Sequence, residues 1–246
     1  MIRYRCKSFF YLALSVLFVS LSAAKCSHNR QERTTQEEAE ELFVKGVEKR
    51  KKGDYEAALS YYTQSIEKDS SFYAAFLNRG YVKEILKDTL GAIQDFVKAG
   101  ELNKEDPVSL NNLGAIYLER QEPEVAEKYF LKAIEVDSLE ANPYYSLGLI
   151  AYDRCQFQEA IFLFKRFIEL KDIALNRLLS LNLYEELMPQ YEIYNTYALY
   201  YIGLAYKNLN QIDSAIYYLK RAIPEGVSEA KDSLNLINEN PKIKEK

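Results

Sequence analysis

Residues 107–140, PVSLNNLGAIYLERQEPEVAEKYFLKAIEVDSLE, decide the fold, because their pattern recurs along the whole chain. The segment carries a glycine, an alanine and a large aromatic residue at fixed places. Each kind recurs in steps of 34 residues: Gly46, Gly80, Gly114 and Gly148; Ala58, Ala92, Ala126 and Ala160; Tyr62, Phe96, Phe130 and Phe164. Several columns that share one period indicate tandem structural units, each of which buries its apolar face only by stacking on its neighbours.

The columns have a physical explanation if each unit is a pair of helices joined by a turn. The glycine lets the first helix approach the second closely, and the alanine lies where the two cross. The aromatic residue fills the space beside the next unit. This pattern resembles the tetratricopeptide repeat (TPR), a helix-turn-helix unit of 34 residues. The resemblance implies an all-α fold, an α-α superhelix (TPR solenoid) of about five repeats with a C-terminal capping helix.

The same phase divides the chain into segments. They are a signal peptide at 1–24, a polar linker at 25–38, repeats 1–4 at 39–174, a helical insertion at 175–195, repeat 5 at 196–223, and a capping helix and tail at 224–246. The step from Gly148 to Gly203 is 55 residues, which places about 21 extra residues around 171–194. These residues are too apolar for an open loop. We expect either an added helix packed on the repeats or a flap over the groove, interrupted at Pro189.

The N-terminus is typical of an exported protein. A basic start is followed by 17 uncharged residues, Ser8 to Ala24, which end in small side chains. Cys26 resembles the lipid-accepting cysteine of bacterial lipoproteins, but Lys25 departs from the usual residue at that place. Lipidation of Cys26 and plain cleavage near Ala24 therefore stay open. Either way, the sequence predicts an exported protein, periplasmic or membrane-anchored in the cell envelope.

Composition excludes several kinds of chemistry. The chain has one histidine, His28, and three cysteines, so it offers no zinc-finger spacing or histidine-based catalytic triad, and we expect no metal and no cofactor. Its net charge of −4 argues against nucleic acid as a partner. Paired carboxylates such as Glu37 and Glu38 leave a carboxylate-based hydrolase as the weakest alternative, because such pairs on helices are usually solvated. We therefore expect that the protein is not an enzyme.

In the TPR family the first helix of each repeat, helix A, lines the concave groove. Carrying that property over by phase predicts a partner-binding site on successive A helices, made of Asn78, Tyr81, Asn111, Asn112, Tyr145 and Tyr200. An asparagine amide can donate to and accept from a peptide backbone, and tyrosine gives broad contact at low entropic cost. The alternative is that some of these side chains close the packing between neighbouring A helices.

These features predict a non-enzymatic protein–protein interaction scaffold of the bacterial cell envelope, which binds a peptide or helix of a partner protein in its groove. A narrower alternative is a lipoprotein subunit of an outer-membrane or pilus assembly machine. The TPR variant that clamps acidic C-termini is not supported, since Phe43, Val47 and Val108 stand where that activity needs other residues, and Asn78 alone matches. The sequence does not identify the partner or the oligomeric state.

Overall fold

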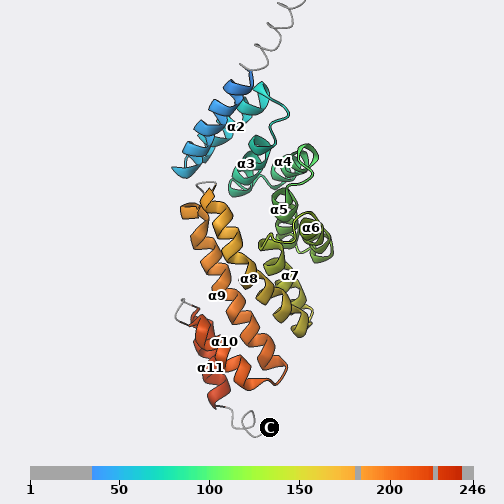
Figure 1. The fold of residues 1–246 in the computed structure, drawn as a ribbon, viewed down its shortest axis with the longest axis vertical. Helices are drawn as coiled ribbons and strands as arrows, with labels where there is room; N and C mark the ends of the chain where they lie inside the picture. Colours follow the sequence, from blue (N-terminus) through green and yellow to red (C-terminus); the bar gives the residue numbers. More distant parts are fainter. Residues whose placement is uncertain (1–34, 181–183, 224–226, 240–246) are drawn as a thin grey trace, which may run out of the picture. The chain divides into compact units, whose positions relative to one another are not determined.

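A computed structural model describes residues 35–180, 184–223 and 227–239, and within these ranges every regular element is an α-helix (Figure 1). The predicted signal peptide, Cys26, His28 and the tail from residue 240 lie outside the described residues. The chain divides into two compact units, residues 1–102 and 103–246.

The first unit contains the first two helix pairs. Residues 35–51 are helical, so the first helix already includes residues 35–38, which the sequence assigned to the linker. It is followed by α2 (Tyr55–Lys68), α3 (Tyr73–Ile85) and α4 (Thr89–Leu102). α2 packs against α3, and α3 against α4.

The second unit continues the alternation of helices and ends with a capping helix. Its elements are α5 (Pro107–Glu119), α6 (Pro123–Val136), α7 (Asn142–Asp153), α8 (Phe157–Ser180), α9 (Tyr184–Asn208), α10 (Ile212–Ala222) and α11 (Ser228–Glu239). In α11, Ala230 and Ile237 are fully buried in one cluster with Leu219 of α10. The predicted all-α fold of paired helices with a C-terminal cap is therefore confirmed.

A contact between glycine and a large side chain closes each pair. A Cβ atom added to Gly114 would lie 2.6 Å from Phe130 Cε1, closer than real Cβ atoms come to another heavy atom. The other pairs repeat it, with nearest distances of 2.6 Å for Gly46 and Tyr62, 2.8 Å for Gly80 and Phe96, 2.8 Å for Gly148 and Phe164, and 2.8 Å for Gly203 and Leu219. All five partners of these glycines are completely buried, and so are the column alanines Ala58, Ala92, Ala126, Ala160 and Ala215.

The described residues of the insertion are helical, and they form neither a separate helix nor a flap. It lengthens two consecutive helices, so that α8 has 24 residues and α9 has 25, against 14 in α6 and 12 in α7. The two lie side by side (Figure 1), and Lys171 Nζ of α8 is 3.3 Å from Glu192 Oε1 of α9. The prediction that Pro189 interrupts the insertion is wrong, because Pro189 lies inside α9. A proline at the sixth position removes one backbone hydrogen bond and crowds the carbonyl four residues before it, but the 25-residue helix continues on both sides.

The turn inside each pair adopts one backbone conformation, although its residues differ. Five equivalent residues have left-handed φ angles: Gly53 (75°), Lys87 (66°), Gln121 (62°), Cys155 (60°) and Asn210 (61°). After α7, the amide of Cys155 donates to the Tyr152 carbonyl and that of Gln156 to the Ala151 carbonyl, both at 2.9 Å. These two bonds form a Schellman motif, in which glycine is the preferred left-handed residue.

We expect the left-handed residue to set part of the stability of each pair. Gly53→Ala should lower the free energy of unfolding by about 1 kcal/mol, through backbone strain alone, since nothing lies within 4 Å of an added Cβ. Cys155→Gly should raise it by about 0.5–1 kcal/mol. Urea unfolding followed by circular dichroism measures both changes.

Cys155→Ala is the matched control for this experiment, because it removes the thiol and keeps a Cβ in the left-handed region. Its stability should stay within about 0.5 kcal/mol of the original. A Cys155→Gly variant that is less stable than Cys155→Ala would contradict the assignment of strain to this turn.

Candidate binding surface on the A helices

The predicted site residues lie on the first helix of successive pairs. Asn78 and Tyr81 belong to α3 in the first unit, and the other four belong to α5, α7 and α9 in the second unit. The predicted site is therefore divided between the two units.

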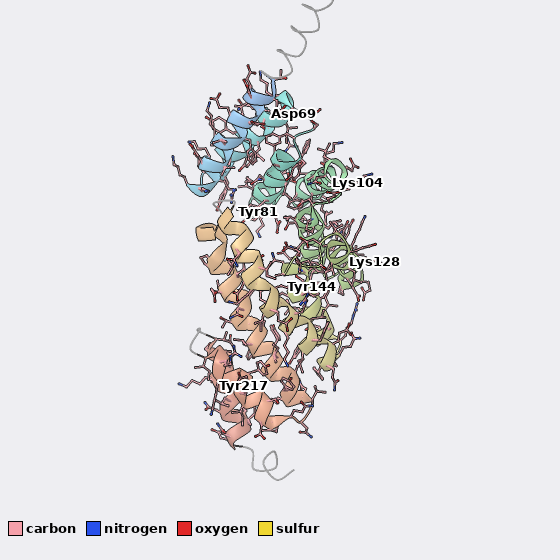
Figure 2. The ribbon with its side chains drawn as sticks, viewed as in Figure 1. Asp69, Tyr81, Lys104, Lys128, Tyr144 and Tyr217 are labelled. Atoms are coloured by element: carbon pink, nitrogen blue, oxygen red, sulfur yellow. The ribbon has the colours of Figure 1, made fainter. Side chains whose placement is uncertain are left out.

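In the first unit, the two predicted residues differ in how exposed their side chains are. Asn78 is half-buried, and its Nδ2 donates to the Ala74 carbonyl of the preceding helical turn at 2.9 Å. Tyr81, labelled in Figure 2, is 42% exposed, and the guanidinium of Arg50 lies 5.6 Å from the centre of its ring. Tyr81 therefore presents an aromatic surface, whereas the Asn78 amide already donates one hydrogen bond within its own helix.

A buried ion network that the sequence analysis missed lies on the same helix. Asp95 of α4, 3% exposed, accepts from Arg79 Nε at 2.8 Å and Arg79 Nη2 at 2.7 Å. Lys83 Nζ lies 2.8 Å from the same carboxylate, and Arg79 Nη1 donates to Thr63 Oγ1 of α2 at 3.3 Å. The network joins α2, α3 and α4, so these two cations serve packing. Two cations four residues apart on α3 were the signal that could have revealed it.

In the second unit, Asn111 and Asn112 are half-buried on α5. Asn111 Oδ1 is buried and has no hydrogen-bond donor among the described residues. A buried acceptor without a donor carries a desolvation cost that an incoming N–H group would relieve. Asn111 is therefore the predicted residue with the clearest unmet binding capacity.

Tyr145 is packed within the protein, in contrast to the expectation that it projects freely into a groove. Its ring stacks on Tyr194 of α9, with centroids 4.7 Å apart and planes 12° apart. It also contacts Phe164 at 5.7 Å and Phe167 at 5.3 Å. Burial raises the pKa of the Tyr145 hydroxyl well above its usual value, and the neighbouring tyrosines add to the rise. The lengthened α9 thus covers one of the six residues that we expected to bind the partner.

Tyr200 is half-buried on α9 and belongs to a wider group of tyrosines. Its ring lies 5.5 Å from that of Tyr201, which in turn lies 5.1 Å from that of Tyr152 on α7. Sequence reasoning found Tyr200 by its phase but missed Tyr152 and Tyr201. Their contact depends on how α7 and α9 lie together, which the period alone does not specify.

Neither a metal-ligand cluster nor a membrane-spanning helix is found in the described part of the chain. Within it, no group of three or more His, Cys, Asp or Glu side chains could hold a metal ion, and no helix is long and apolar enough to cross a membrane. The acidic pairs near the first helix form exposed ion pairs, with Glu38 bonded to Lys68 at 2.6 Å and Glu41 to Lys45 at 2.7 Å.

We expect the packed and the open predicted residues to respond differently to truncation. Tyr145→Ala should lower the free energy of unfolding by about 2 kcal/mol or more, because it removes a ring from an aromatic cluster, whereas Asn112→Ala should change it by no more than about 0.5 kcal/mol. Tyr145→Phe keeps the ring and is the control. Thermal unfolding distinguishes these variants, and equal melting temperatures for Tyr145→Ala and Tyr145→Phe would show that the ring is not part of the core.

Comparisons with known proteins agree with this architecture. Models of the tetratricopeptide repeat match residues 43–107, 108–136 and 197–223. The part between the last two matches contains α7, α8 and the lengthened start of α9. No curated protein matches the sequence significantly.

Several solved structures share the fold. MamA is 23% identical, with a TM-score of 0.56 over 79% of this chain and 95% of that chain. YrrB, a TPR protein with an unusual peptide-binding site, is 19% identical, with a TM-score of 0.54 over 78% and 89% of the two chains. PilF of Pseudomonas aeruginosa is 22% identical, with a TM-score of 0.52 over 81% and 97%. At these identities the likeness shows the fold alone. Together with the three family matches, it establishes that the chain contains tetratricopeptide repeats.

Proposed function

We propose that the protein is a non-enzymatic interaction scaffold that holds a peptide or helix of a partner protein against its A helices. The observation that carries the proposal is the buried side-chain oxygen of Asn111, Oδ1, which has no hydrogen-bond donor among the described residues. Asn111 lies on an A helix, the helix that the repeat pattern predicts to bind the partner. Buried polar atoms are nearly always paired, so an unpaired one on a binding helix suits a ligand that brings an N–H group.

The chemistry of the surface supports a peptide as the ligand. Asn111 and Asn112 are adjacent on α5, and an amide can both accept from a backbone N–H and donate to a backbone C=O. Tyr200 supplies a half-buried ring on α9 of the same unit. Amides together with tyrosine rings form the kind of surface that binds a polypeptide without requiring charge.

We further propose that the scaffold works in the bacterial cell envelope. Support comes from the sequence of residues 1–24, which has the layout of a signal peptide, and from Cys26, which would accept a lipid. Service as a lipoprotein subunit of an outer-membrane or pilus assembly machine is the narrower form of this proposal.

The binding surface is tested by crosslinking in intact cell envelopes, followed by capture of the protein. The double variant Asn111→Ala, Asn112→Ala should lose the main crosslinked partner while its unfolding free energy falls by no more than about 0.5 kcal/mol. Asn235 and Asn238 are exposed on α11, so Asn235→Ala, Asn238→Ala is the matched control and should keep the partner. If both double variants capture the partner equally well, the binding surface is elsewhere.

The envelope location is tested through Cys26. A lipid chain contributes about 0.8 kcal/mol of membrane affinity per buried methylene, so Cys26→Ser should move the protein from the membrane fraction to the soluble periplasm. Fractionation followed by immunoblotting measures the shift. A mature N-terminus at Lys25, found by mass spectrometry, would exclude lipidation and leave export intact.

A further inference from the structure

The structure assigns a second binding element to the ends of α7 and α9, which we name the cation subsite: Tyr152, Asp153, Tyr200, Tyr201 and Asn208. We propose that the cation subsite receives a lysine or arginine side chain of the partner polypeptide. The inference rests on the proposed scaffold function and specifies which chemistry the partner must carry.

Three tyrosine rings form the walls of the cation subsite. The rings of Tyr152 and Tyr201 have centroids 5.1 Å apart and planes at 64°, and those of Tyr200 and Tyr201 have centroids 5.5 Å apart and planes at 58°. All three rings are half-buried. Each of these tyrosines therefore keeps part of its surface open to solvent, and ring faces attract cations through their quadrupole.

Hydrogen bonding and burial hold these rings in place. Asn208 Nδ2 of α9 donates to the Tyr152 hydroxyl of α7 at 3.4 Å, and Tyr201 stacks on the buried Phe164 with planes 12° apart. Burial raises the pKa of Tyr152 and of Tyr201. Asp153 directly follows Tyr152 at the end of α7, and its carboxylate, together with the neighbouring Tyr200, adds to both rises in pKa.

The charge of the cation subsite is negative. Asp153 is exposed and makes no ion pair with any described residue. Asp153 is the last residue of α7, and Asn208 is the last residue of α9. The negative ends of these two helix dipoles add to the negative potential of the carboxylate. A cation bound here would meet a carboxylate, two helix C-termini and aromatic faces together.

The cations nearest in sequence leave Asp153 unpaired. Arg154 directs its guanidinium to α6, with Nη1 2.7 Å from Glu127 Oε2 and Nη2 3.5 Å from Glu124 Oε1. Lys207, next to Asn208, forms no ion pair with Asp153 within 4 Å. The acid therefore remains available to a cation supplied by a ligand.

The cation subsite is tested on the full chain with labelled peptides that differ only in one side-chain type. The probes are Gly-Lys-Ser-Lys-Ser-Lys-Gly, the same peptide with every lysine acetylated at Nε, and the same peptide with glutamate for lysine. The acetylated peptide keeps the length and the alkyl stem but has no charge. Fluorescence anisotropy should show the lysine peptide binding at least about fivefold more tightly than either of the others, the combined effect of a cation–π contact and an exposed ion pair.

Variants then locate the binding. Asp153→Asn should weaken binding of the lysine peptide about threefold, which is the usual contribution of an exposed ion pair. Tyr200→Leu should weaken it about two- to fivefold, because it removes a cation–π contact. Asp232 is exposed on α11, so Asp232→Asn removes the same charge elsewhere in the unit and should leave the affinity unchanged. Because Asp153 is exposed, Asp153→Asn is not expected to unfold the chain, and its melting temperature checks this.

Two results would overturn the cation subsite. One is equal binding, or no binding, of the lysine and acetyl-lysine peptides. The other is an equal loss in Asp153→Asn and Asp232→Asn, which would mean that only the net charge of the protein attracts the peptide. Capture of the envelope partner distinguishes failure of the cation subsite from failure of the proposed scaffold function. If Asp153→Asn captures as much of the partner as the original chain does while the Asn111 and Asn112 variant loses it, the cation subsite fails and the scaffold function stands.

Discussion

The contact between a glycine on the first helix and a large side chain on the second is the constraint on which each helix pair depends. A methyl group on any of the five glycines would come within 2.6–2.8 Å of its partner side chain, so the helices approach as closely as they do only because the glycines lack one. The approach buries Tyr62, Phe96, Phe130, Phe164 and Leu219 completely. Leu219 shows that the second position requires bulk and not an aromatic ring.

The periodic part of the fold could be predicted from the sequence because it rests on sizes of side chains. Small and large residues in one phase specify which faces meet, and every residue of the alanine and aromatic columns is fully buried. The shared left-handed turn could not be read in the same way. Lys87, Gln121, Cys155 and Asn210 adopt it with unrelated side chains, since the conformation is imposed by the ends of the two helices and by the hydrogen bonds across them.

The candidate site was harder to predict than the fold, for a related reason. The position of a residue within the 34-residue repeat places it on helix A, but it does not specify which side chains of other helices pack against it. The aromatic partners of Tyr145 include Tyr194, which belongs to the lengthened start of α9, where the 34-residue period no longer applies. Pro189 suggested a break at this place, yet α9 runs through it, and continuity of the helix is what brings Tyr191 and Tyr194 beside α7. Asn142 Nδ2 donates to the Tyr191 hydroxyl at 3.1 Å, which adds a polar link to the stack.

The lengthened α9 decides which of the predicted binding residues are covered and which stay accessible to a partner. Near its start, α9 stacks Tyr194 on Tyr145, whereas near its end Tyr200 is half-buried, with its ring against that of Tyr201. Asp153 at the end of α7 is exposed. In the first unit, the cations on α3 that could attract an acidic ligand are instead bound to Asp95. The charges that remain unpaired therefore distinguish possible ligands. A peptide segment can pair with both groups if it brings a backbone N–H to Asn111 and a basic side chain to Asp153. An acidic tail would instead be repelled by the Asp153 carboxylate and by two negative helix ends.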